Sequence, residues 1–222
     1  MLKHKYLGAI LIILAASCSP SNKASDFTRG EIRTIEAADS IMRVLTIDDP
    51  ADYLVLRAPS HDLSDDALLS SDYEKLAELM VATVTHPSQD GVGIAGPQVG
   101  LNRRVVAVQR FDKEPVLRAG RLDHPFEVYP NIRIVWASDS LATGSEGCLS
   151  VPDRRGDVLR STEIVIEYAD ITGLKDADSK SNPAQPAGGT VPIVRDTVSG
   201  FTAVIFQHEI DHLEGVLYID RL

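Results

Sequence analysis

The chain is poor in cysteine. Its 222 residues contain two, Cys18 and Cys148, and Cys18 follows an apolar stretch at the N-terminus that is typical of a removable leader. The rest of the chain has one cysteine, so it cannot form an internal disulfide. Clusters of basic residues are also missing, and 22 Lys and Arg against 32 Asp and Glu give a formal net charge of −10. This acidic balance argues against a nucleic acid as partner.

Long apolar runs are absent as well. The run Leu7–Ala16 is too short to cross a bilayer as a helix. It follows Lys3 and Lys5 and ends in small residues just before Cys18, an order that is typical of a secretory signal. Small residues directly before a cysteine resemble a bacterial lipoprotein signal. We therefore expect a signal peptide over residues 1–17, a lipid anchor on Cys18 that holds the protein at a membrane, and a domain outside the cytoplasm. The alternative is a cytoplasmic protein with an apolar N-terminus.

Two segments follow the leader. Residues 18–41 are expected to contain a polar tether, Ser19–Gly30, and a possible extra helix, because isoleucine and leucine recur at helical spacing over Glu31–Leu45. Residues 42–222 are expected to form a single catalytic domain. Loss of residues 1–17 would remove two lysines and no acid, so the formal charge would fall from −10 to −12.

The most informative stretch is His208-Glu209-Ile210-Asp211-His212, near the C-terminus. Two histidines four residues apart lie on one face of a helix, so both imidazoles can bind one metal ion, and Glu209 beside them can deprotonate a water. Apolar residues at helical spacing over Phe201–Leu213 predict that helix, with most of its circumference suited to burial, and Gly215 is a stop signal just after it. The motif indicates a metal-dependent hydrolase. The alternative is two histidines packed in a core.

The motif by itself lacks one ligand, because an open catalytic metal site generally has three from the protein. In one large group of metallopeptidases the third ligand is a histidine downstream of the motif, and here Tyr218 stands at that position. Only Asp220 offers a conventional ligand between there and the terminus. The third ligand is therefore expected upstream.

Cys148 is the preferred third ligand. It lies among glycines in the segment Thr143–Pro152, and glycines let a backbone pass close to another element. A lone cysteine is often only a small buried apolar residue. Beside a histidine pair that lacks a partner, a thiolate ligand is favoured. The rivals lie in segments that are typical of surface loops: His61, His86 and His124.

The segment Gly91–Gly96 matches the dinucleotide fingerprint G-x-G-x-x-G. That fingerprint requires a strand before it and a helix after it. Here the order is reversed, because Asp72–Val84 is predicted to be a helix with a capping box that starts at Ser71, and Arg104–Gln109 is predicted to be a strand. We expect either a tight connection or a loop that presents its backbone and Gln98 to a ligand.

The chain resembles the peptide deformylase family in three segments, and such motifs occur in this order in that family. The segments are Gly91–Gln98, Glu146–Ser150 and His208–Gly215. The resemblance extends from Met42 to the C-terminus. It implies a single α+β domain in which small antiparallel β-sheets wrap around a central metal-binding helix. The implied enzyme is a metal-dependent hydrolase of linear amides that removes the formyl group from N-formyl-methionyl peptides and releases formate. The implied metal is one divalent ion, Fe(II), which Zn or Ni often replaces in preparations.

The resemblance also implies a role for each matched residue. The metal ligands would be Cys148, His208 and His212. Glu209 would take a proton from water and pass it to the leaving amine. The groups that stabilise charge on the formyl oxygen would be the metal, the Leu149 backbone N–H and the Gln98 amide.

Other matched residues would bind the peptide or support the ligands. Gly93 would offer backbone hydrogen bonds to the peptide. The wall of a methionine pocket would consist of Val92, Val204 and Ile205, for which plain core packing is the alternative. Glu146 and Arg155 are expected to support the site rather than take part in the chemistry.

Two departures from the family pattern stand out. Gly96 occupies a position where alanine is usual, and residues 173–189 form a longer link than usual, with the composition of an exposed loop. Two other functions stay open, a metallopeptidase that cleaves internal amide bonds and a non-catalytic surface lipoprotein that binds formyl-peptides. Tyr218 weighs against the first, and retention of Glu209 and Gln98 weighs against the second.

Overall fold

The computed structural model describes residues 24–89, 91–118, 120–172 and 190–222. The predicted signal peptide, Cys18 and the 173–189 segment lie outside the described residues. The helices are α1 (Arg29–Glu36), α2 (Pro50–Leu56), α3 (Asp65–Leu68), α4 (Ser71–Val84) and α6 (Gly200–Leu213), with the 3-10 helices η1 (Gly96–Val99) and η3 (Tyr218–Arg221). The strands are β1 (Gly93–Ala95), β2 (Val105–Gln109), β3 (Val116–Arg118), β4 (Arg121–Asp123), β5 (Phe126–Pro130), β6 (Arg133–Ala137), β7 (Leu141–Cys148), β8 (Val151–Ser161), β9 (Glu163–Ala169) and β10 (Ile193–Ser199).

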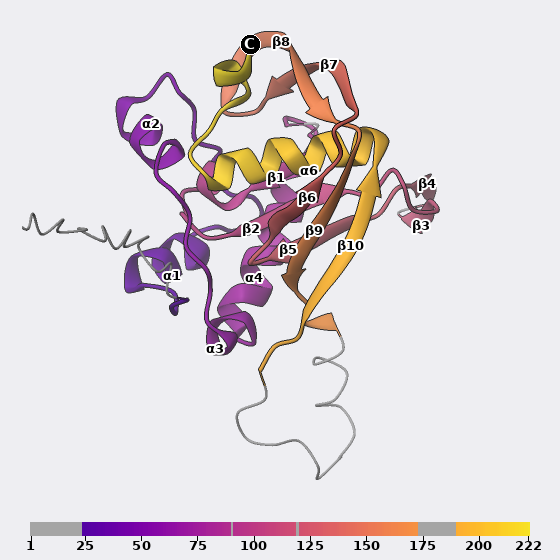
Figure 1. Cartoon of the computed structure of the whole chain (residues 1–222). Coiled ribbons are helices and arrows are strands. Elements are labelled where there is room, and N and C mark those ends of the chain that lie inside the picture. The colour runs from indigo at the N-terminus through magenta and orange to yellow at the C-terminus, as the bar shows by residue number, and fades with distance from the viewer. Residues whose placement is uncertain (1–23, 90, 119, 173–189) are drawn as a thin grey trace, which may run out of the picture.

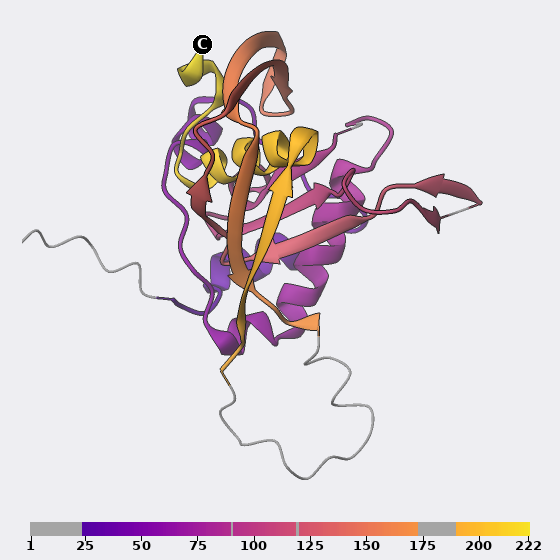
Figure 2. The ribbon, with the colours of Figure 1, turned by 45° about the vertical axis from the view of Figure 1, so that its right-hand side comes forward.

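The strands form small sheets around α6. One sheet has the order β1-β2-β5 and another the order β10-β9-β6, and both are antiparallel throughout. The hairpin β7-β8 covers α6 from above in Figure 1, and the hairpin β3-β4 projects from the body in Figure 2. The predicted fold class, an α+β domain with small antiparallel sheets around a central helix, is confirmed.

Strand β2 shows how the sequence builds this core. All five of its residues are buried. Successive side chains of a strand point to opposite faces, and the two faces of β2 belong to different apolar clusters. Val105 and Ala107 pack with the cluster that contains α4, whereas Val106 and Val108 pack with the cluster that contains α6. The β-branched run is therefore apolar on both faces because a helix covers each side.

Two helix boundaries differ from those predicted. Helix α4 begins one residue earlier than expected, because the Ser70 hydroxyl, and not that of Ser71, accepts a hydrogen bond from the Tyr73 backbone N–H at 3.2 Å. The extra helix predicted over Glu31–Leu45 ends at Glu36 as α1. Beyond it the chain runs across α4, where the Met42 backbone N–H donates to Thr83 Oγ1 at 2.8 Å.

The segment Ser19–Gly30 was predicted to be a polar tether. The part of it that the structure describes, from residue 24 onward, packs against the folded domain. Arg103, 4 % exposed, donates to both carboxylate oxygens of Glu31 at 2.6 and 2.8 Å and to Ser25 Oγ at 2.8 Å. Ser25 also forms a bridge with Leu63. Any free tether after Cys18 therefore ends before Ser25. Within the described parts of the chain, none of the helices combines the length and apolar character that a membrane span requires.

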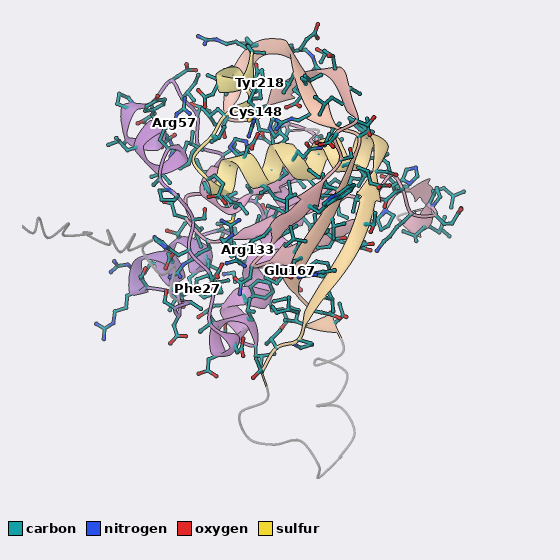
Figure 3. All side chains as sticks on the ribbon, viewed as in Figure 1. Phe27, Arg57, Arg133, Cys148, Glu167 and Tyr218 are labelled. Atoms are coloured by element: carbon teal, nitrogen blue, oxygen red, sulfur yellow. The ribbon has the colours of Figure 1, made fainter. Side chains whose placement is uncertain are left out.

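The C-terminal end of α6 follows the predicted stop. Gly215 has φ 71°, and a Cβ at this position would lie 2.4 Å from the Arg57 carbonyl oxygen, so glycine is required there. The Arg57 guanidinium binds the Asp220 carboxylate, which commits Asp220 to a structural ion pair. Figure 3 shows the chain returning past Arg57 so that Tyr218 lies near Cys148.

Candidate metal centre

Three ligand-type side chains converge above α6. His208 and His212 project from one face of the helix, as their spacing predicts, and Cys148 arrives from the end of β7. Their potential ligand atoms all lie within 4.8 Å of one another, and Cys148 Sγ lies 3.2 Å from His212 Nε2. A tetrahedral centre with ordinary metal–sulfur and metal–nitrogen bonds would hold these two atoms about 3.6 Å apart. The donor set therefore fits a single divalent ion.

The β7-β8 hairpin delivers the cysteine. The two strands pair in regular register from Leu141 to Gly147, and the register then shifts so that Cys148 faces Val151 across a tight turn. A shift of this kind bends the strand and re-aims a side chain. Tyr218, which stands where one group of metallopeptidases has a downstream histidine ligand, instead lies beside the His208 ring with the ring centroids 6.1 Å apart.

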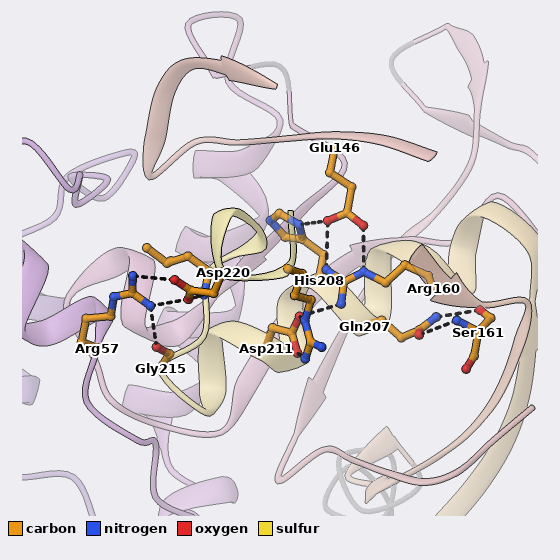
Figure 4. A network of polar contacts seen from close by, with 11 residues as sticks. Arg57, Glu146, Arg160, Ser161, Gln207, His208, Asp211, Gly215 and Asp220 are labelled. Carbon is orange, nitrogen blue, oxygen red and sulfur yellow. Dashed lines mark hydrogen bonds and ion pairs between the residues drawn. The ribbon is translucent and has the colours of Figure 1, made fainter. Parts of the chain in front are cut away.

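A buried charged network orients His208. Its Nδ1 lies 2.8 Å from Glu146 Oε2, and Arg160 donates to both oxygens of Glu146 at 2.7 and 2.9 Å (Figure 4). Burial alone would raise the pKa of Glu146, but the hydrogen bonds from Arg160 and His208 outweigh it and lower that pKa to about 2. Glu146 therefore stays a carboxylate that accepts the Nδ1 proton and leaves His208 Nε2 free for a metal.

Arg160 is the residue that the sequence analysis missed. It is buried on β8, and besides Glu146 it binds Asp211 of the His208–His212 motif at 2.6 Å. The arginine expected to support the site was Arg155. Arg155 is exposed at the cleft, where its guanidinium donates to the Ser145 carbonyl at 3.4 Å. The sequence around Arg160 gave little signal, because the segment Asp157–Ser161 mixes charged, polar and apolar residues.

We expect Arg160→Leu to lower the free energy of unfolding by about 3–5 kcal/mol, because it leaves the buried Glu146 carboxylate without its arginine and removes one of the two arginines that bind Asp211. The measurement is urea unfolding followed by circular dichroism. Arg195→Leu is the matched control, since Arg195 forms an ion pair with Glu167 from a side chain that is 67 % exposed. It should change stability by about 1 kcal/mol or less. Equal losses of stability in the two variants would show that the buried network around Arg160 stabilises the fold no more than an exposed ion pair does.

Glu209 is the buried carboxylate of the cleft. It is 4 % exposed, and its Oε2 atom is buried with no hydrogen-bond partner among the described residues. Burial raises the pKa of Glu209 to about 7. A Cβ at residue 93 would lie 2.5 Å from Glu209 Oε1, so Gly93 is what lets the carboxylate lie against β1. This carboxylate can accept and release a proton near neutral pH.

Gln98 is held on η1 with its amide turned toward the ligands. Its Oε1 accepts from the Ala95 N–H at 2.8 Å, and its Nε2 lies 3.3 Å from Ser150 Oγ and 3.5 Å from Cys148 Sγ. Gly96, the departure from the family pattern, has a local reason, because a Cβ there would lie 2.6 Å from the Arg103 carbonyl oxygen. The glycine segment Gly91–Gly96 follows the helix α4 and precedes the strand β2. A dinucleotide-binding loop has the opposite order, a strand before it and a helix after it.

These groups line one cleft of about 900 Å³. The predicted site residues that border it are Val92, Gly93, Gln98, Glu146, Cys148, Leu149, Arg155, Val204, Ile205, His208 and Glu209. Phe201, expected to lie in a buried stripe, borders the cleft as well and is 58 % exposed. Among the described residues, the group of side chains that could hold a metal ion consists of Cys148, His208 and His212. The rival histidines His61, His86 and His124 are not part of it.

Comparisons with known proteins agree with this geometry. Residues 41–178 and 192–222 match the family described as Polypeptide deformylase. A peptide deformylase of Leptospira biflexa is 33 % identical over 184 residues, which covers 82 % of this chain and 88 % of that protein. Peptide deformylase 2 of Gloeobacter violaceus is 36 % identical over 168 residues, covering 76 % and 74 % of the two chains. The Met-Ala-Ser-bound class I type b peptide deformylase of Acinetobacter baumannii superposes with a TM-score of 0.63 at 30 % identity, covering 82 % of this chain and 98 % of that one.

Proposed function

The chain belongs to the peptide deformylase family, and from this premise we propose a role for each residue of its cleft. The protein is a metal-dependent hydrolase that removes the formyl group from N-formyl-methionyl peptides and releases formate and a free amine. The arrangement that carries the proposal is a trio of converging ligands, Cys148, His208 and His212, beside a buried carboxylate. One oxygen of that carboxylate has no hydrogen-bond partner in the described part of the chain.

The ion held by Cys148, His208 and His212 is proposed to be Fe(II), with Zn or Ni able to take its place. One thiolate and two imidazoles are ligands that all three metals accept. When bound, a divalent ion supplies Lewis acidity, which lowers the pKa of water from about 15.7 toward 7 and polarises a carbonyl oxygen. Metal analysis of protein purified without oxygen tests the identity of the ion, and zinc as the sole metal under those conditions would exclude iron.

Glu209 is proposed to move the proton. A carboxylate with a pKa near 7 can take a proton from the attacking water and later give it to the amine as the carbon–nitrogen bond breaks. Its position beside His208 on α6, with Oε2 unpaired among the residues that the structure describes, leaves an oxygen available for this exchange. The formyl group leaves as formate, and the peptide keeps its methionine with a free amine.

Gln98 and the Leu149 backbone N–H are proposed to stabilise the negative charge that develops on the formyl oxygen. The Gln98 carbonyl is already used by Ala95, so its amide hydrogens face the ligands and need no reorganisation during the reaction. Loss of one such donor typically lowers turnover about 10²–10³-fold.

The peptide is proposed to lie along β1, with its methionine side chain in the apolar part of the cleft. β1 is an edge strand in the order β1-β2-β5, so the backbone of Gly93 can bond to an added extended chain. Val92, Val204 and Ile205 border the cleft and offer the apolar wall that a methionine side chain requires. The neighbouring structure with Met-Ala-Ser bound supports a peptide of this kind as the ligand.

Incubation of the Fe(II)-loaded protein with formyl-Met-Ala-Ser tests the reaction, with formate and free amine measured together. We expect the two products in equal amounts, and no hydrolysis of acetyl-Met-Ala-Ser, whose extra methyl group crowds the reacting carbon. Cleavage of an internal peptide bond, or binding without release of formate, would overturn the assignment in favour of a metallopeptidase or a binding protein.

For the cellular location, we propose cleavage before Cys18, lipidation of that cysteine and a membrane-anchored domain outside the cytoplasm. The signal-like order of residues 1–17 supports this. The chain from Cys18 to Ser25 can span about 25 Å at most. Because Ser25 is docked on the body, a lipid on Cys18 would hold the domain close to the membrane surface. The substrates would then be formyl-peptides outside the cytoplasm.

We expect Cys18→Ser to abolish labelling by a radioactive fatty acid and to leave uncleaved precursor or soluble product. Two or more acyl chains give stable attachment and would be the sole anchor once residues 1–17 are removed. Deformylase activity of the purified domain should stay the same, because the Cys148 site does not include Cys18. Native protein found soluble in the cytoplasm with its first 17 residues intact would contradict the location and leave the reaction standing.

A further inference from the structure

Helix α2 turns its apolar residues outward. Its one acidic residue, Asp52, is 5 % exposed and accepts hydrogen bonds from two guanidinium nitrogens of Arg43 at 2.8 and 2.7 Å. Leu56, four residues further on, is buried on the same side of the helix. The exposed positions of α2 are all apolar or aromatic, and they are Pro50, Ala51, Tyr53 and Leu54. A surface helix usually has the opposite arrangement, with its acids in water and its leucines in the core.

These four exposed residues are here called the α2 face (Pro50, Ala51, Tyr53 and Leu54). Leu54 is 72 % exposed and Tyr53 is 41 % exposed. The Tyr53 ring is held at the edge of the face, because the Arg57 guanidinium lies over it, 5.1 Å from its centroid, while it also binds Asp220. A single exposed leucine is common, but a contiguous apolar face on a fixed helix indicates a surface for interaction.

The route of the chain shows which partner lies closest to this face. Ser25 is docked on Arg103, and the chain from Cys18 to Ser25 spans about 25 Å at most. Figures 1 and 2 both show α2 on the same side of the body as α1, which begins four residues after Ser25. Asn102, next to Arg103, donates to the Val55 carbonyl oxygen at 2.8 Å, so α2 and the docked segment share one support. A lipid on Cys18 would therefore bring this side of the domain to the membrane.

We propose that the α2 face inserts into the lipid interface of the membrane to which Cys18 is anchored. This inference rests on the proposed cellular location. Leu54 gains by leaving water for the acyl boundary, and an amphipathic ring such as that of Tyr53 suits the headgroup level. A tether turns this contact into an intramolecular one, so a few apolar side chains suffice to hold it. The contact fixes how the domain is oriented at the membrane.

Uncharged phosphatidylcholine is the lipid that this face fits. Asp48 and Asp49 are exposed just before the α2 face, and the chain without residues 1–17 has a formal charge of −12. Anionic headgroups therefore offer no attraction, and burial of apolar side chains supplies the contact. A second copy packed symmetrically on the same face would bring the two pairs of aspartates together, which disfavours that occupant.

The test couples the protein to vesicles through Cys18 itself. The metal-loaded mature chain, residues 18–222, contains all the described residues and is joined to a maleimide lipid in phosphatidylcholine vesicles. The metal protects Cys148 from the maleimide, and mass spectrometry confirms one lipid per chain. Part of the phosphatidylcholine carries bromine on its acyl chains, which quenches tryptophan that reaches the lipid.

Two tryptophan variants report on opposite sides of the domain. Trp136 is the single tryptophan of the chain, so both variants carry Trp136→Phe. Leu54→Trp places the reporter on the α2 face. Leu117→Trp is the matched control, because Leu117 on β3 is 74 % exposed and Figures 1 and 2 both show the β3-β4 hairpin on the side opposite α2.

We expect Leu54→Trp to lose most of its emission on brominated vesicles and to shift to shorter wavelength, whereas Leu117→Trp keeps its emission. Exchange of half of the phosphatidylcholine for phosphatidylserine should not increase the quenching. Because tryptophan itself favours interfaces, hydrogen exchange of the unsubstituted chain is measured as well. The backbone N–H groups of α2 should exchange more slowly on vesicles than in solution, and Leu54→Ser should lose this protection.

Three results would overturn the contact: unchanged emission of Leu54→Trp, equal quenching of both reporters, or a dimer of the uncoupled chain that Leu54→Ser dissociates. Coupling replaces the lipidation step of the cell, so these results would leave the proposed lipidation of Cys18 standing. If the cell does not lipidate Cys18, the location fails while the quenching still identifies the α2 face as a lipid-binding surface. Formate release should be the same on and off vesicles, because α2 does not border the cleft.

Discussion

Replacing Glu209 with glutamine is expected to lower kcat by about 10²–10⁴-fold while the metal content stays at one ion per chain. Glutamine has nearly the same size and fills the same buried space beside Gly93, so the fold should persist. It cannot take the proton from water or return it to the amine. The loss should therefore appear in kcat with formyl-Met-Ala-Ser, and elemental analysis should show unchanged metal.

The matched control for this prediction is Glu78→Gln on α4, an exposed glutamate outside the cleft, which should leave kcat unchanged. Turnover of Glu209→Gln within a few-fold of wild type would exclude Glu209 as the base. Loss of metal from the same variant would instead make Glu209 a ligand.

Replacing Cys148 with alanine is expected to strip the metal or leave it weakly held. Cys148 supplies the one thiolate of the cluster, and its Sγ lies 3.2 Å from His212 Nε2. Mutation of a residue that only supports a ligand typically weakens metal binding about 10–100-fold, and removal of a charged ligand should exceed that. The metal is measured by elemental analysis after dialysis against a weak chelator, and circular dichroism checks the fold.

Cys148→Asp separates loss of the ligand from damage to the β7-β8 hairpin. A carboxylate is also a metal ligand, so this variant should regain part of the metal that the alanine variant loses. Full metal occupancy in Cys148→Ala would show that the third ligand is another group. Absence of metal from both variants, with an unfolded hairpin in both, would show that Cys148 acts through folding alone.

Local pattern was enough to predict the elements that depend on near neighbours in the chain. The helix that became α6, its stop at Gly215 and the shared face of His208 and His212 follow from a period of 3.6 residues and from glycine's freedom. The strand β2 follows from a β-branched run. The three motifs of the cleft could be recognised because each is a short continuous segment, and the fold class followed from the family resemblance that they carry.

Other features of the structure depend on which elements pack against a segment. The periodicity of apolar residues in the sequence carries no information about those partners. The extra helix ends at Glu36 because the chain beyond it is drawn across α4 toward Thr83. Arg160 lies on β8, far in sequence from α6, and it stays charged when buried because Glu146 on β7 and Asp211 on α6 both form ion pairs with it. Such contacts form only after the β7-β8 hairpin closes over α6.

The exposure of Phe201 is the clearest feature that the sequence pattern did not predict. Its place in an apolar stripe predicted burial, and the same stripe leads to the metal ligands. An amphipathic pattern tells which residues share a face, but a face that meets the core and a face that lines a cleft look alike in sequence. Only the position of β1 and β7 on either side of α6, set by their pairing with β2 and β8, leaves that stripe open to a peptide.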